Sequence, residues 1–155
     1  MRLRVVALGH RMPAWVTAGW EDYARRMPRD FPVELAELKP EPRDRGKTVP
    51  QLLAAEATRI SVACKDAQVV ALDERGESWT TRRLADALET WRAHARDTAF
   101  VIGSADGLSP EVKQKASAVV ALSALTLPHG LVRIVLAEQL YRAVSLLSGH
   151  PYHRE

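Results

Sequence analysis

Three short apolar runs, separated by segments with helical spacing, constrain most strongly how this chain can fold. The runs are Gln68–Leu72, Thr98–Ile102 and Ala118–Leu122. Each lacks the polar alternation of a half-exposed strand, which is the pattern of a parallel strand covered on both faces. The helical segments between them are long enough to be crossover connections. The sequence therefore predicts an α/β fold, with a mostly parallel sheet and helices on both faces.

The flanking segments extend this pattern toward the start of the chain. Leu3–Leu8 is a β-branched run that ends at Gly9, and Phe31–Leu38 alternates with period two, as expected of a half-exposed edge strand. Because one linker-like segment and no repeat are present, we expect a single domain over residues 1–155. Helices are expected at residues 14–27, 51–63, 82–96 and 131–147, a short one after Ser109, and loops at 39–50 and 73–77.

Composition limits the environment and the partners of the chain. Cys64 is the one cysteine, so no internal disulfide can form, and its apolar surroundings predict a buried, unreactive thiol in a cytoplasmic protein. The longest uncharged stretch, residues 116–132, contains serine, threonine and proline and is a poor membrane span. The net charge is +3, with basic residues around 25–29 and 39–47. That excess fits either an anionic partner or an ordinary solvated surface.

The loops that follow the three apolar runs are the candidate ligand site. Ligands of open α/β sheets bind beyond the carboxyl ends of the strands, here residues 72–76, 103–107 and 122–130. The third loop is apolar and contains Pro128 and Gly130, which suits either a backbone enclosed around a ligand or a plain strand-to-helix connection. The chain has no GxGxxG or GxxxxGK[ST] motif. A Rossmann dinucleotide site and a P-loop are therefore disfavoured.

The last six residues, His150–Glu155, include two histidines, a tyrosine, an arginine and a glutamate. A disordered terminus is more often made of small polar residues, so these side chains are candidates for a function. His150 and His153 are three residues apart, but no cysteine or acidic cluster stands beside them to complete a tetrahedral set, so we expect no metal. A Ser-His-Asp triad is also disfavoured because no GxSxG elbow is present.

The final third of the chain resembles a known family. ALSALTLPHGLVRIVLAEQLYRA (residues 121–143), followed by GHPYHRE (149–155), is similar to the ribosomal RNA large subunit methyltransferase H family. The resemblance covers essentially the whole chain. It includes Phe100–Gly103 with Gly107–Pro110, and a front pattern of Gly9, Met12, Pro13, Trp15, Gly19, Tyr23, Arg26 and Pro28.

The resemblance implies a SPOUT-class fold with a C-terminal trefoil knot, a homodimer, and S-adenosyl-L-methionine as cofactor. It implies methylation of N3 of a pseudouridine in 23S rRNA on the assembled ribosome. One departure is Ser104, where the family commonly has a second glycine; serine would be strained there if the backbone needs a positive φ. By the family pattern the cofactor contacts are Leu72, Gly103, Leu122, Ser123, Ala124, Leu125, Thr126 and Leu127.

The implied reaction needs groups that the apolar loop lacks, apart from His129. Removing the N3 proton leaves negative charge on two flanking carbonyls, so a base and a cation are required. Besides His129, the candidates are His153 as base, Arg142 and Arg154 as cations, and Tyr152 as a stacking partner of the target base.

Each of these assignments has an alternative. His129 would then only shape its loop, Arg142 would pair with Glu138, and Tyr152 would anchor the tail. We also expect the tail to complete the site of the second subunit. The alternative functions are methylation of another RNA, such as tRNA, and a non-catalytic ribosome-assembly module.

Overall fold

A computed structural model describes residues 1–153 and confirms the parallel α/β sheet. The strand order is β2-β1-β4-β3-β5, and every neighbouring pair within it is parallel. The half-exposed strand, β2, lies at one edge as predicted. The strands are β1 (Leu3–Leu8), β2 (Val33–Leu38), β3 (Gln68–Ser78), β4 (Thr98–Ile102) and β5 (Ala118–Ala121).

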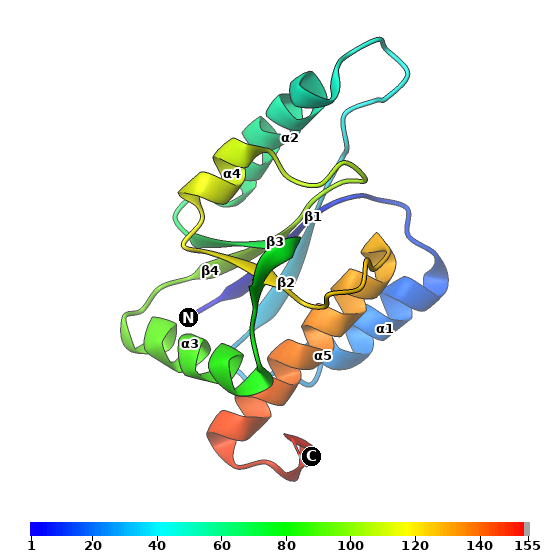
Figure 1. Ribbon diagram of the computed structural model, residues 1–155. Coiled ribbons are helices and arrows are strands. Elements are labelled where there is room, and N and C mark those ends of the chain that lie inside the picture. The colour runs from blue at the N-terminus through cyan, green and yellow to red at the C-terminus, as the bar shows by residue number, and fades with distance from the viewer. Residues whose placement is uncertain (154–155) are drawn as a thin grey trace.

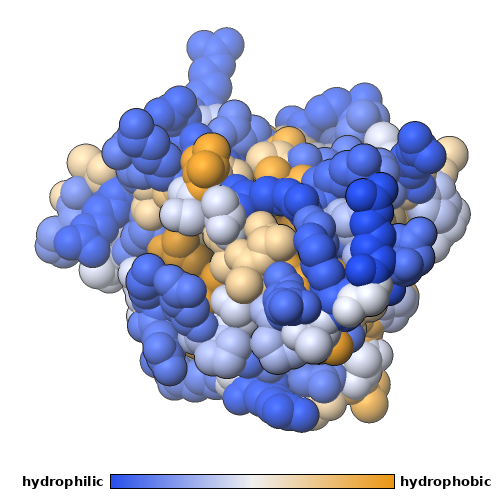
Figure 2. Space-filling view, turned by 90° about the horizontal axis from the view of Figure 1, so that it is seen from above, coloured by the Kyte–Doolittle hydropathy of each residue, from blue (hydrophilic) through white to orange (hydrophobic). Residues whose placement is uncertain are grey.

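Helices cover both faces of this sheet (Figure 1). Buried side chains of α1, α3 and α5 pack on one face, and those of α2 pack on the other, together with part of α4. Seen from above, the side that carries α2 and α4 shows mostly hydrophilic side chains with small apolar groups among them (Figure 2). The helices are α1 (Ala14–Ala24), α2 (Val49–Ala63), α3 (Thr81–Ala93), α4 (Pro110–Lys115), α5 (His129–Ser148) and a 3-10 turn, η1 (Pro151–His153).

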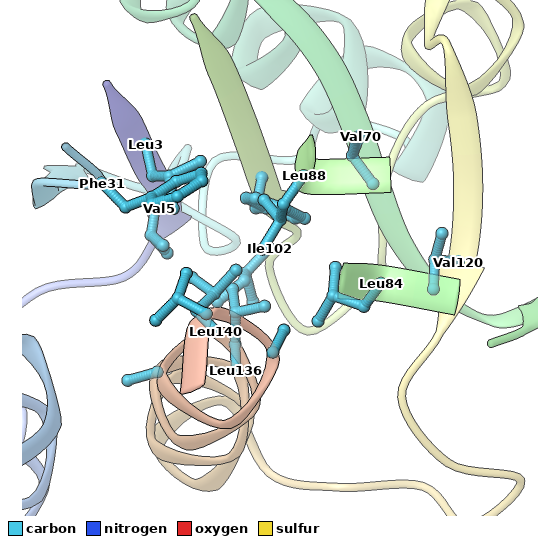
Figure 3. Close-up of a cluster of buried hydrophobic side chains, with 14 of the residues drawn as sticks. Leu3, Val5, Phe31, Val70, Leu84, Leu88, Ile102, Val120, Leu136 and Leu140 are labelled. Atoms are coloured by element: carbon cyan, nitrogen blue, oxygen red, sulfur yellow. The ribbon is translucent and has the colours of Figure 1, made fainter. Parts of the chain in front are cut away.

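The strands supply both layers of the core because their side chains alternate in direction. In β1, Val5 belongs to the cluster under α5, whereas Val6 belongs to the cluster under α2. Leu136 and Leu140 of α5 point into the first cluster (Figure 3). This layer is the larger of the two, and α5 contributes more than one buried side chain to it.

Truncating Leu140 tests how much α5 contributes to stability. The side chain is fully buried, and its removal leaves a cavity in a close-packed layer. Leu140→Ala should lower the free energy of unfolding by about 2–5 kcal/mol in urea denaturation. A loss below about 0.5 kcal/mol, the scale of a surface substitution, would contradict this packing.

The predicted loop at 73–77 is wrong, because β3 continues through it to Ser78. The pairing with β5 shifts register between Leu72 and Glu77, so the polar residues in between form an irregularity within the strand. Gly76 passes so close to β5 that a Cβ there would lie 2.8 Å from the Val119 backbone. The second half of this strand is mostly exposed and therefore polar, so its sequence resembles that of a loop.

Other expectations from composition agree with the described residues. Cys64 is buried, and burial raises the pKa of its thiol to about 11, which keeps it protonated and unreactive. None of the helices within residues 1–153 has the length and apolar character needed to span a bilayer. α2 begins at Val49, earlier than predicted, because the Thr48 hydroxyl accepts a hydrogen bond from the backbone N–H of Gln51.

Candidate functional site

A cavity of about 380 Å³ lies beyond the carboxyl ends of the central strands. Its walls come from the middle of β3, the end of β4 with the loop that follows it, the segment after β5, and the start of α5. The cavity therefore brings together the three segments that the sequence singled out, although the first of them is part of β3 and not a loop. Seven of the eight predicted cofactor residues line it, namely Leu72, Gly103, Leu122, Ser123, Leu125, Thr126 and Leu127. The eighth, Ala124, lies in the same loop and is exposed, but it is not among the lining residues.

The loop after β4 is a tight turn that glycines permit. A Cβ on Gly103 would lie 2.6 Å from the carbonyl carbon of Gly107, so the two backbones meet where only glycine fits. Gly107 has a φ of +80° and donates its N–H to the Ser104 carbonyl at 2.9 Å. Ser104 itself is not among the residues with positive φ. The backbone strain considered for Ser104 is therefore absent. The left-handed conformation of this turn is adopted by Gly107 instead.

The apolar loop after β5 is held by short polar contacts. The backbone N–H of Leu125 donates to the Ser123 hydroxyl at 2.9 Å, and the Thr126 hydroxyl donates to Glu74 of β3 at 2.5 Å. Leu125 is 74% exposed, an unusual position for a large apolar side chain at the mouth of a cavity. The loop thus offers an apolar surface and a fixed backbone to a ligand.

Of the predicted catalytic side chains that the structure describes, that of His129 alone lines the cavity. It is the first residue of α5, whose first turns are fixed by buried Arg133. The Arg133 guanidinium donates to Glu37 at 2.6 Å and to the Gly9 carbonyl at 2.8 Å. Burial lowers the pKa of His129, and the charge of Arg133 adds to this effect, while a hydrogen bond with the Ser104 backbone opposes it. The imidazole is therefore neutral at neutral pH and available as a base.

The lowered pKa of His129 predicts how stability depends on pH. A histidine whose pKa in the folded protein is below its unfolded value of 6.5 binds fewer protons in the folded state than in the unfolded state. Its contribution to the free energy of unfolding is therefore lost as the pH falls from 6.5 through the folded pKa. The free energy of unfolding of the wild type should fall relative to His129→Gln between about pH 7 and pH 5. Urea titrations of both proteins at several pH values measure it. A constant difference across this range would contradict the assignment.

The tail lies at the other end of α5 and packs on its own chain. The Tyr152 hydroxyl donates to Glu138 at 3.0 Å, and its ring lies 4.5 Å from the Tyr141 ring. Arg142 pairs with Glu138 at 2.6 Å and lies over the Tyr152 ring at 5.1 Å. Burial and hydrogen bonds with Tyr23 and Glu138 raise the pKa of Tyr152, which keeps the phenol protonated. The structure thus contains both contacts that were the alternatives to catalytic roles: Arg142 pairs with Glu138, and Tyr152 anchors the tail.

Among the described residues, His129 does not meet Arg142 or Tyr152 within one chain. His129 and Arg142 are separated by roughly 20 Å along the helix axis, at 1.5 Å per residue. Figure 1 likewise shows the chain after Ser148 at the opposite end of α5 from its start, where η1 lies. The side chain of His153 and the whole of Arg154 lie outside the described residues. Within the described part of the chain, the cavity and Tyr152 therefore lie at separate places on α5.

A polar cluster that the sequence did not predict lies behind the loop after β4. Glu56 of α2 is 2% exposed and bonds to Ser104, and Arg43 from the preceding connection bonds to both. Glu56 is four residues from both Leu52 and Ile60, so it lies on the buried face of α2. A charged residue at a position of the apolar pattern was the feature of the sequence that could have indicated this cluster. As for metals, residues 1–153 contain no group of three or more histidine, cysteine or acidic side chains that could hold one.

A model of a family described as predicted SPOUT methyltransferases matches residues 1–153. This chain belongs to the SPOUT methyltransferase family. Relatives named ribosomal RNA large subunit methyltransferase H include one from Nitrosospira multiformis, 58% identical over 99% of both chains. Another from Burkholderia thailandensis is 54% identical over the same shares. The family assignment confirms the class that the sequence resembled.

Two solved structures share the fold at low sequence identity. A putative methylase family protein from Neisseria gonorrhoeae aligns with a TM-score of 0.56 at 14% identity, covering 90% of this chain and 81% of its own. A probable methylase family protein from Haemophilus influenzae aligns with a TM-score of 0.57 at 16% identity, covering 99% and 70%. At these identities the likeness shows a shared fold alone.

Proposed function

We propose that this protein uses S-adenosyl-L-methionine to methylate N3 of a pseudouridine in 23S rRNA on the assembled ribosome. The observation that carries the proposal is the 58% identity, over 99% of both chains, to a ribosomal RNA large subunit methyltransferase H. The cavity supports it at the expected place in an α/β sheet. A cytoplasmic location, a trefoil knot and a homodimer belong to the same proposal.

The cavity suits the proposed cofactor in size and in surface. Its volume of about 380 Å³ lies within the range of small-molecule sites. Gly103 and Gly107, whose backbones meet so closely that a Cβ on Gly103 would lie 2.6 Å from Gly107, both line the cavity. Leu72, Gly103 and the loop from Leu122 to Leu127 would hold the cofactor, with apolar side chains against its ring and backbone groups for its polar edges.

In the proposed mechanism the chain positions the base and manages one proton. The bound cofactor supplies an electrophilic methyl group on a sulfonium centre. His129, neutral because burial lowers its pKa, accepts the N3 proton of the target base. Arg142 and Arg154 offset the negative charge that spreads over the two flanking carbonyls, and Tyr152 stacks on the base. His153 is the second candidate for the base.

The separation along α5 favours a site built from two chains. One protomer would supply the cavity and His129, and the tail of its partner would supply Arg154 and Tyr152. In that arrangement the Tyr152–Glu138 hydrogen bond of 3.0 Å would open or be shared when RNA binds. A C2 dimer with such an exchange contains two identical composite sites.

Tritiated methyl transfer distinguishes the proposed substrate from the other functions. Purified protein and labelled S-adenosyl-L-methionine are incubated with intact ribosomes, free 23S rRNA and tRNA. The proposal predicts label in ribosomes well above the other two, located by nuclease mapping to a pseudouridine. Label in tRNA instead would indicate another RNA substrate. A protein that binds ribosomes but does not bind S-adenosyl-L-methionine would be an assembly module.

A further inference from the structure

A buried carboxylate lies behind the loop after β4, outside the cavity. Glu56 accepts hydrogen bonds from Arg43 at 2.7 Å, from the Ser104 hydroxyl at 2.7 Å and from the backbone N–H of Glu41 at 3.0 Å. Burial raises the pKa of Glu56, but the bonds from Arg43 and Ser104 outweigh it, so the net pKa is lowered. The carboxylate is therefore charged and fully engaged. Removing one of its partners would leave charge unpaired in a dry site, which is costly.

Arg43 connects this carboxylate to the turn that lines the cavity. Its Nη1 donates to Glu56 and to the Glu41 carbonyl, both at 2.7 Å. Its Nη2 donates to the Ser104 hydroxyl at 2.7 Å and to Asp106 at 3.1 Å, and its Nε donates to Asp106 at 3.2 Å. One planar guanidinium thus binds the turn at two residues and α2 at a third. This geometry requires the fork of donors that lysine lacks.

The residues bound by Arg43 belong to the cavity wall. Ser104 and Asp106 both line the cavity, on either side of Ala105. The Ser104 backbone also bonds to His129. The turn itself is short, closed by the Gly107 N–H and the Ser104 carbonyl at 2.9 Å. A shift of Ser104 would therefore move both the backbone beside Gly103 and the hydrogen-bond partner of the candidate base.

We propose that Arg43 and Glu56 are positioning residues that hold the turn of residues 103–107 in its cofactor-binding conformation. This inference rests on the proposed function. Arg43 acts through Ser104 and Asp106 rather than by attracting RNA, although it lies in the basic connection between β2 and α2. The Ser104 hydroxyl, which a glycine would lack, adds a direct link from the turn to Glu56 and a second point of attachment for Arg43 beside Asp106.

Calorimetric titration of the full-length protein with S-adenosyl-L-methionine, without ribosomes, tests the proposal. Arg43→Met should weaken cofactor binding about ten-fold, as expected when a preorganised wall is released. Arg43→Lys should weaken it by a similar factor because an ammonium cannot span the same partners. Ser104→Ala and Glu56→Gln should each give a smaller loss. In steady-state assays the KM for the cofactor should rise while the KM for ribosomes stays within about two-fold.

Arg59→Met is the matched control. Arg59 also binds the connection before α2, through Glu41 at 2.5 Å and the Lys39 carbonyl at 2.9 Å, rather than the turn. It should bind the cofactor as the wild type does. Thermal unfolding of each variant without cofactor confirms that it is folded. Where Arg43→Met fails to fold, Arg43→Lys and Ser104→Ala decide the outcome.

The outcomes separate this inference from the function on which it rests. Wild-type affinity in Arg43→Lys and Ser104→Ala would overturn the inference while leaving the proposed function intact. A rise in the KM for ribosomes alone would overturn it too, and would assign Arg43 to an RNA contact. A wild-type protein that binds no cofactor would defeat the proposed function, and this inference with it.

Discussion

Deleting residues 150–155 should reduce methyl transfer to ribosomes by at least about 100-fold, the usual contribution of a positioned acid–base or charge-stabilising group. The truncated chain keeps the whole cavity, including Gly103 and His129. We therefore expect its affinity for S-adenosyl-L-methionine to stay close to that of the wild type. Initial rates with tritiated cofactor and saturating ribosomes measure the first effect, and calorimetry measures the second.

Two controls keep this truncation interpretable. The tail packs on Tyr141 and Glu138, so thermal unfolding must show that the truncated chain remains folded. Tyr152→Phe removes the bond to Glu138 but keeps the ring, and it should lose less than ten-fold, since one hydrogen bond is worth about 1 kcal/mol. A truncated protein with the wild-type rate would show that the tail takes no part in the reaction.

Gly103→Ala should weaken cofactor binding by about 100-fold or more, because a displacement of about 1 Å in a binding wall has effects of that size. The added Cβ would lie 2.6 Å from both the carbonyl carbon and the carbonyl oxygen of Gly107, and 3.0 Å from Leu108 Cγ. Backbone atoms cannot yield as a flexible side chain does. The turn of residues 103–107 must therefore shift into or away from the cavity. Calorimetric titration with S-adenosyl-L-methionine measures the loss.

Gly9→Ala is the control for this substitution. Gly9 follows β1 as Gly103 follows β4, but a Cβ there would meet Met12 Cε at 3.0 Å, the far end of a flexible side chain. This variant should bind the cofactor as the wild type does. Equal affinities in Gly103→Ala and the wild type would mean that the cavity is not the cofactor site.

The sequence predicted the parts of the fold that local pattern determines. The unbroken apolar runs at Gln68–Leu72 and Thr98–Ile102 lie at the sheet centre, and the alternating run before Leu38 lies at its edge. Ala118–Leu122 was expected to be a strand buried on both faces, but β5 (Ala118–Ala121) is an edge strand and half of it is partly exposed. An apolar run marks a strand without fixing its neighbours, since pairing depends on chain topology.

The candidate site was predicted only where it coincides with strand ends. The loops around Gly103 and Leu122 follow from the rule that ligands bind at carboxyl ends. The attachment of Ser104 to Glu56 and Arg43 was invisible, because these residues are 48 and 61 positions away along the chain. The separation of His129 from Tyr152 agrees with the helix predicted between them, which is 20 residues long in the structure.

The most direct test of the account is a mixed dimer of two inactive chains. Gly103→Ala, with a defective cavity and an intact tail, is co-expressed with the chain truncated after Gly149, which has the reverse defects. Different tags allow the mixed species to be purified. If the tail acts on the partner's cavity, each mixed dimer has one intact site and should methylate ribosomes at about half the wild-type rate. A mixed dimer as inactive as its two parents would contradict the composite site.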